Sequence, residues 1–221
     1  MPRLTGYEKQ FPTWGDLARE QLRRRGLPYF VDVQAAIQSR LEQLAPEARK
    51  AFALACAERA MKRHEGLPKP RPFTMSWRPV LDVMWLGLTR RSKDAENRVR
   101  AALKAFHESP FDHDDGQDGP DDADEDAAAA SIYASECFLN GDAQNAGLPA
   151  SRALDGAFAE ADEDLDLDPN DFVCDPAAEP MPLAKEAMHP AVQDELQRQL
   201  ADLDRLEHDG VTVDVIRFLK R

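Results

Sequence analysis

The amino-acid sequence predicts an all-α fold, in which residues 1–221 form a single compact multi-helix bundle of about eight or nine helices. Apolar residues recur at spacings of three and four along most of the chain, which is the spacing of one helical face. Alternation of β-branched residues, which would indicate strands, is nearly absent, and only Val211–Val215 hints at it. Prolines and glycines fall between the periodic stretches, where helices begin and end.

Five helices are expected in the first half of the chain. Residues 13–16 resemble a capping box and open a short helix that ends near Gly26. A second helix follows Pro28, and a third runs from Pro46, a residue favoured in the first helical turn, to about His64. A fourth is capped by Ser76, and a fifth follows the polar break at residues 90–92. The inner faces of the last four contain, in order, Phe30, Val33, Ile37, Leu41 and Leu44; Ala48, Phe52, Ala55, Cys56 and Ala60; Leu81, Met84, Trp85 and Leu88; Val99, Ala102, Leu103 and Phe106.

Four further helices are expected in the second half. The sixth spans residues 124–140 and ends at Gly141, and its acidic first turn suits the positive end of the helix dipole. Pro149 is expected to begin the seventh helix, which continues through Ala161. Pro190 opens the eighth, which ends around residues 209–210, and Thr212 precedes a short tail helix.

Two acidic loops are expected between these helices, at about residues 109–123 and 162–184. Nine of the fifteen residues 112–126 are acidic and none is Lys or Arg. The formal charge is +10 over residues 1–104, −21 over residues 105–184 and −2 over residues 185–221. A field of this sign repels phosphate backbones and attracts cationic partners, so we expect no nucleic acid as a partner of the whole chain.

The composition is typical of a cytoplasmic protein that is soluble and reduced. A chain of 221 residues with 43% hydrophobic residues can bury a core without disulfide or metal staples. The three cysteines are widely spaced and form no C-x-x-C pair. The sequence lacks both a signal-like N-terminus and eighteen consecutive apolar residues, so no membrane association is expected.

The motifs of common enzyme classes are absent, so we expect no catalytic residues, no cofactor and no enzymatic activity. The chain contains no G-x-G-x-x-G, Walker-type or G-x-S-x-G sequence. The acidic loops do not match a calcium-binding EF-hand. Starting the motif at Asp162 puts Leu167 at the turn glycine and Val173 at the closing glutamate, and starting it at Asp112 fails at the twelfth position.

Two polar groups allow an alternative interpretation. The first group consists of residue types that could hold a transition metal: His107, Asp112, His113 and Glu136. A metal site there would make the chain a small helical metal-dependent enzyme or metal-binding protein. A polar loop is the simpler interpretation, and no metal site is predicted.

The second group is the charged pair Glu58-Arg59, which lies among small residues on the third helix. It is expected to be a partly buried structural ion pair.

Three stretches resemble an all-helical bacterial family of uncharacterised function, itself similar to an immunity-protein family of polymorphic toxin systems. These are L-x-x-L-x-P-x-x-R-x-A-F-A-x-A-x-A-E-R at residues 41–59, the Trp-centred helix at residues 81–85 with the later alanine-rich helix pair, and HPAVQDELQRQLADLDRL from His189. The resemblance covers about residues 30–210, and the acidic, Pro-rich loops are departures from it. It implies a protein that blocks a cognate toxin by binding it.

The expected function is therefore a non-enzymatic binding protein, an immunity protein that neutralises a basic toxin domain through acidic surface. The alternative for the first acidic segment is a solubilising, disordered linker. The predicted partner-binding residues are Asp114, Asp115, Asp118, Asp121, Asp122, Asp124, Glu125, Asp126, Asp162, Glu163 and Asp164.

Overall fold

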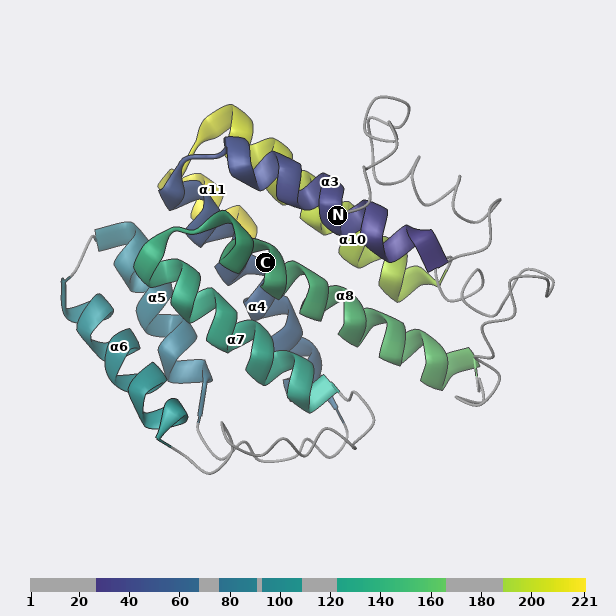
Figure 1. The fold of residues 1–221 in the computed structure, drawn as a ribbon, viewed down its shortest axis with the longest axis horizontal. Helices are drawn as coiled ribbons and strands as arrows, with labels where there is room; N and C mark the ends of the chain where they lie inside the picture. The colour runs from purple at the N-terminus through teal and green to yellow at the C-terminus, as the bar shows by residue number, and fades with distance from the viewer. Residues whose placement is uncertain (1–26, 68–75, 91–92, 109–122, 166–188) are drawn as a thin grey trace.

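The computed structural model describes residues 27–67, 76–90, 93–108, 123–165 and 189–221, and within them the chain forms eight α-helices and no strand (Figure 1). The all-α prediction is confirmed. The helices are α3 (Leu27–Gln43), α4 (Pro46–Gly66), α5 (Arg78–Arg90), α6 (Lys93–His107), α7 (Ala123–Asn140), α8 (Ala143–Leu165), α10 (Pro190–Asp209) and α11 (Val213–Leu219). The helix predicted at residues 13–26 lies outside the described residues.

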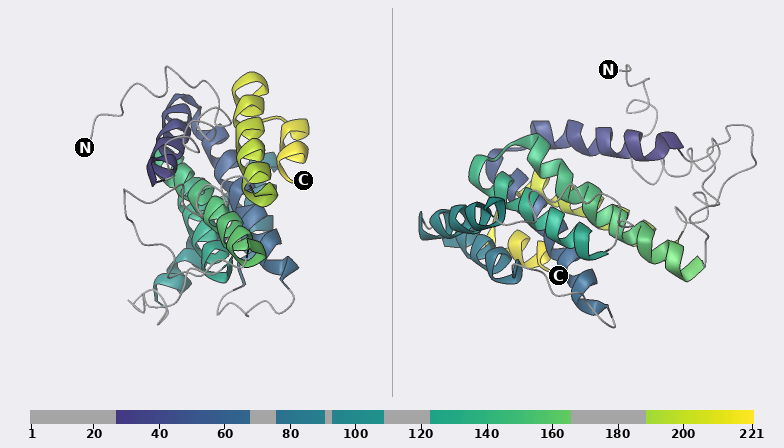
Figure 2. Two further views of the ribbon diagram at one scale, coloured as in Figure 1. Left: turned by 90° about the vertical axis from the view of Figure 1, so that its right-hand side faces the viewer. Right: turned by 60° about the horizontal axis from the view of Figure 1, so that its bottom comes forward.

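Helix α4 is the centre of the bundle. It packs against α7 and α8 over much of its length and also contacts α5, α10 and α11. Small side chains, from Ala51 through Ala57, are almost completely buried along it, and they let neighbouring helices approach closely. Helices α5 and α6 lie together at one end of the bundle, and the C-terminal end of α8 projects at the other (Figure 2).

The predicted core residues whose side chains the structure describes are buried, except that Leu88, Ala102 and Phe106 are partly buried. Trp77 and Trp85 are 2% and 3% exposed, and Cys56 lies within the core of α4. Burial raises the pKa of the Cys137 thiol to about 12, so this thiol is protonated at neutral pH and is a poor nucleophile. Both cysteines therefore serve as small core residues.

Most helix ends occur where the sequence predicts them. Helices α4 and α10 begin at Pro46 and Pro190, and α7 ends before Gly141, whose φ of 67° is the left-handed conformation that glycine tolerates. The Thr212 hydroxyl accepts a hydrogen bond from the Val215 N–H at 3.2 Å and caps α11.

The predicted start of the seventh helix is wrong. Helix α8 begins at Ala143, and Pro149 lies inside it. The Asp142 carboxylate accepts hydrogen bonds from the N–H groups of Gln144 (2.8 Å) and Asn145 (3.1 Å), so Asp142 is the capping residue. Because this cap satisfies the first turn, the helix forms before the proline and tolerates it.

The acidic loops are also shorter than predicted. Residue 123 belongs to α7, and residues 162–165 are the last turn of α8 rather than the beginning of a loop. The remainder of both predicted loops, residues 109–122 and 166–184, lies outside the described residues.

Candidate functional site

Glu58 and Arg59 are both buried on α4, but they do not pair with each other. Successive residues on a helix point about 100° apart, so the two side chains reach different neighbours. Arg59 faces α10, and Glu58 faces α5. The prediction of one structural ion pair is therefore replaced by two separate buried centres.

The Arg59 centre consists of Arg59, Glu195 and Asp202. The Arg59 guanidinium donates to both Glu195 oxygens at 3.1 and 3.0 Å and to Asp202 Oδ2 at 2.6 Å. Gln199 completes it, because its amide donates to Glu195 Oε1 (2.8 Å) and to the Ala150 carbonyl of α8 (2.9 Å). The cation and the two carboxylates thus connect α4 with α10, and Gln199 adds a link to α8.

The charge balance of this centre shifts the pKa values of its members. Burial alone would lower the pKa of the Arg59 guanidinium, but Glu195 and Asp202 outweigh burial and raise it. Burial raises the pKa of the Asp202 carboxyl, and Arg59 offsets this only in part. Burial also raises the pKa of the Cys56 thiol, so Cys56 stays protonated beside Arg59.

Asp202 should make the stability of the protein depend on pH. Its pKa in the folded protein is above the value of 3.8 in the unfolded chain, so the folded state takes up a proton first as the pH falls. The contribution of Asp202 to the free energy of unfolding therefore rises from pH 7 towards pH 4. Urea unfolding at several pH values should show that the free energy of unfolding of the wild type rises relative to that of Asp202→Asn as the pH falls from 7 to 4. A fall relative to the variant would contradict a raised pKa of Asp202 in the folded protein.

The Glu58 centre consists of Glu58, Arg78, Trp85 and Glu65. Arg78 Nη1 donates to both Glu58 oxygens at 2.8 and 2.9 Å, and the Trp85 indole N–H donates to Glu58 Oε2 at 3.1 Å. The other side of the Arg78 guanidinium donates to Glu65. Every one of these contacts joins a residue of α4 to a residue of α5, so this centre fixes α5 on α4.

The chemistry available to the Arg59 centre is limited by burial. Arg59, Glu195 and Asp202 are 8%, 3% and 4% exposed, so a substrate in solution does not reach them. Their hydrogen-bonding groups are used within the fold. We assign both centres to the assembly of the bundle.

The structure describes two of the four residues of the metal alternative. His107 is the last residue of α6 and its ring contacts that of Phe106, Glu136 lies on α7, and Asp112 and His113 are outside the described residues. Within the part of the chain that the structure describes, no three His, Cys, Asp or Glu side chains gather closely enough to hold a metal ion.

The predicted partner-binding residues fall into three groups. Asp114, Asp115, Asp118, Asp121 and Asp122 lie outside the described residues. Asp124 and Glu125 occupy the first turn of α7, and Asp162 the end of α8. Asp126 is 2% exposed, and its carboxylate accepts a hydrogen bond from Arg152 at 3.3 Å, so it faces inward.

Glu163 and Asp164 are exposed at the C-terminal end of α8. We call Glu160, Asp162, Glu163 and Asp164 the α8 acidic end. The backbone carbonyls at this end carry the negative pole of the helix dipole, and the last turn of α8 contains no basic residue. Glu160 pairs with Arg63 at 2.9 Å, and Asp164 Oδ2 lies 3.3 Å from His189 Nε2. Glu163 has no ion-pair partner within the described ranges.

The acids of the α8 acidic end therefore lie at the end of the helix where negative charge is unfavourable. Acids stabilise a helix at its N-terminus, as in the first turn of α7, and destabilise it at its C-terminus. Arg63, which pairs with Glu160, compensates only part of this charge. A local cost at a position without an ion-pair partner among the described residues, as at Glu163, is typical of residues kept for binding.

Comparisons with protein-family models, with curated proteins and with solved structures found no match for this chain. Among the described residues, no helix has the length and apolar character needed to cross a lipid bilayer.

The sequence did contain a signal for the Arg59 centre. Glu195, Gln199 and Asp202 are spaced by four and three residues and lie on the same face of α10 as its buried leucines. Polar residues that repeat on the apolar face of a helix need partners inside the protein. The sequence does not show which helix supplies the cation, because that depends on the tertiary structure.

Proposed function

We propose that this chain is a non-catalytic binding protein of the immunity type, which neutralises a basic toxin domain by direct contact. The α8 acidic end supplies the described part of the contact surface. The observation that carries this proposal is the exposure of Glu163 and Asp164 at a helix C-terminus, where they weaken the helix.

A basic partner removes the local cost of these carboxylates. A Lys or Arg side chain brought to the α8 acidic end offsets both the mutual repulsion of the acids and their repulsion by the helix carbonyls. The −21 charge of residues 105–184 adds a long-range field that accelerates the encounter with a cationic protein. Buried Asp126 is not part of this surface.

The toxin as partner is an expectation of the sequence resemblance, and its basic character follows from the charge. Toxins that cut nucleic acid carry basic surfaces for their own substrate, and an acidic inhibitor can cover such a surface. The proposal requires no chemistry from the inhibitor, in agreement with the internal use of both buried centres.

The test is a calorimetric titration of the full chain with the toxin domain encoded by the neighbouring gene. Neutralising the α8 acidic end with Asp162→Asn, Glu163→Gln and Asp164→Asn should weaken binding by about tenfold to a hundredfold, because the variant loses charge at the contact. The wild-type affinity should also fall between about 50 and 300 mM salt, since exposed charges are screened.

A matched control separates the site from net charge. Glu42→Gln, Asp204→Asn and Asp214→Asn likewise remove three negative charges, at exposed positions on α3, α10 and α11, and should leave affinity within about threefold of wild type. Absence of binding to the toxin domain would overturn the proposed function. Equal weakening by both triple variants would show that net charge, rather than the α8 acidic end, determines affinity.

A further inference from the structure

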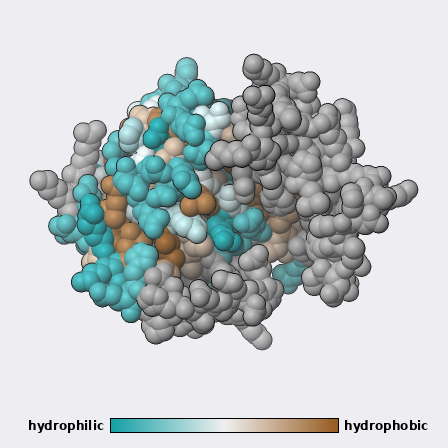
Figure 3. Space-filling model, viewed as in Figure 1, coloured by the Kyte–Doolittle hydropathy of each residue, from teal (hydrophilic) through white to brown (hydrophobic). Residues whose placement is uncertain are grey.

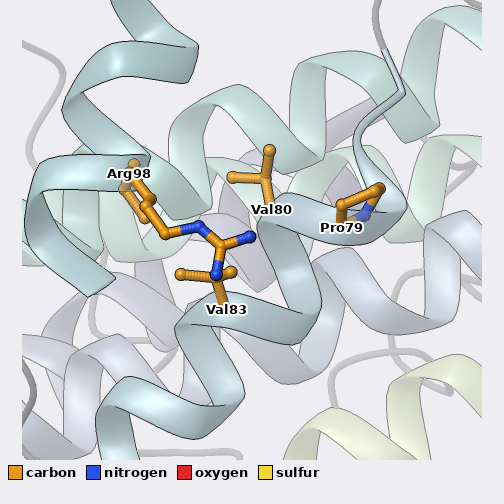
Figure 4. A pocket seen from close by; sticks show the side chains of 5 residues that line it. Pro79, Val80, Val83 and Arg98 are labelled. Carbon is orange, nitrogen blue, oxygen red and sulfur yellow. The ribbon is translucent and has the colours of Figure 1, made fainter. Parts of the chain in front are cut away.

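Helices α5 and α6 form a second surface of opposite character at the other end of the bundle. Between them lies a groove of about 140 Å³, lined by Pro79, Val80, Val83, Arg98 and Val99. Figure 4 shows the Arg98 side chain extending from α6 over the valines of α5. This volume is below that of most cofactor pockets but suits a single apolar side chain.

The apolar lining continues onto exposed surface. Pro79, Val83, Leu86 and Arg90 are spaced by four, three and four residues, so they follow one face of α5. Leu86 is 52% exposed, which is unusual for a leucine on a helix that otherwise buries its large apolar residues. Figure 3 shows hydrophobic residues at this end of the viewed face with hydrophilic residues around them.

Positive charge without internal partners borders this groove. Arg90, Arg98 and Arg100 are exposed and have no ion pair within the described part of the chain, although Asp94 lies one turn before Arg98. Lys104 is paired only with Glu108, at 3.6 Å. Residues 78–107 contain seven Lys/Arg against three Asp/Glu, in a protein of net charge −13.

From these observations we propose that the α5–α6 face binds an acidic protein segment that carries an apolar anchor, such as one face of an amphipathic helix. A leucine-type side chain of the partner enters the groove between Val80 and Val83 beside Leu86. Carboxylates of the partner pair with Arg98 and Arg90 at its rim. This is the arrangement of helix-in-groove recognition, in which the apolar anchor gives affinity and the charges give orientation.

The apolar floor favours a protein segment over nucleic acid. A phosphate backbone satisfies the arginines but leaves the exposed Leu86 side chain in water. This inference does not rest on the proposed function, because the two surfaces differ in position and in charge.

The test uses the full chain and a fluorescein-labelled synthetic helix of glutamate, alanine and leucine, with the leucines on one face. Fluorescence anisotropy should show saturable binding. The double variant Leu86→Asp/Arg98→Glu should weaken it by at least about tenfold, which is the effect of losing an anchor contact and reversing a charge. Both positions are exposed, so thermal unfolding should be unchanged.

The matched control is Val213→Asp/Arg217→Glu on α11, where Val213 is 56% exposed and Arg217 is also at the surface. This variant should bind the peptide as wild type does. The proposal is overturned if the peptide does not bind or if both double variants bind it equally well. It is also overturned if a peptide with glutamine in place of leucine, or a single-stranded oligonucleotide of the same charge, binds as tightly.

Discussion

Replacing Arg59 with methionine is expected to lower the free energy of unfolding by about 3–5 kcal/mol, because it leaves two buried carboxylates without their cation. Glu195 and Asp202 are both less than 5% exposed, so water cannot replace the guanidinium. The contacts also hold α10 on α4, and their loss weakens the packing of the C-terminal helices. Urea unfolding followed by circular dichroism measures the change.

Two further variants separate charge from packing. Arg205→Met removes an arginine that is 50% exposed on α10 and should change stability by less than about 0.5 kcal/mol. Replacing Arg59, Glu195 and Asp202 together with Met, Met and Leu should recover much of the loss, since no unpaired charge remains. A loss of below about 1 kcal/mol in Arg59→Met would contradict a central role for this ion cluster.

Replacing Gly141 with alanine is expected to cost about 2–3 kcal/mol, for two independent reasons. The φ of 67° is strained for any residue with a Cβ. That Cβ would also lie 2.8 Å from the Cβ of Pro46, a rigid ring at the start of α4. The α7–α8 turn therefore has to move away from the central helix.

Gly66→Ala is the matched control for this variant. Gly66 ends α4, its φ is not positive, and an added Cβ meets nothing within 4 Å. Thermal unfolding should find this alanine neutral or slightly stabilising, because it reduces the freedom of the unfolded chain. Equal stability of Gly141→Ala and wild type would show that the turn can relax, contrary to the close contact with Pro46.

The helices that the sequence predicts best are those whose ends carry a strong local signal. Pro46, Pro190 and Thr212 act within one turn of the residues they cap, so their effect can be read without the fold. The sequence-based prediction for the start of α8 is wrong because it rests on Pro149, whereas the helix is capped by Asp142. Both are helix-start residues, and only the structure shows that the cap precedes the proline.

The contacts of the buried polar residues are less predictable from the sequence than the helix ends. Adjacent residues on a helix cannot share one partner face, so Glu58 and Arg59 could have been separated from the sequence alone. Their partners could not have been named, because Arg59 bonds Asp202 across 143 positions and Glu58 bonds Arg78 across 20. Such pairings depend on how helices meet. The charge of the α8 acidic end was visible in the sequence, but its position on a helix C-terminus was not.

The proposed function requires that Asp162, Glu163 and Asp164 serve binding and not folding. The most direct test of this requirement is the free energy of unfolding, at low salt and without a partner, of the variant Asp162→Asn/Glu163→Gln/Asp164→Asn. We predict that this variant is more stable than wild type by about 1 kcal/mol, because repulsion from the helix carbonyls is removed. The triple variant at Glu42, Asp204 and Asp214 should show no such gain. A loss of stability in the α8 variant would show that these carboxylates support the fold, and would contradict this requirement.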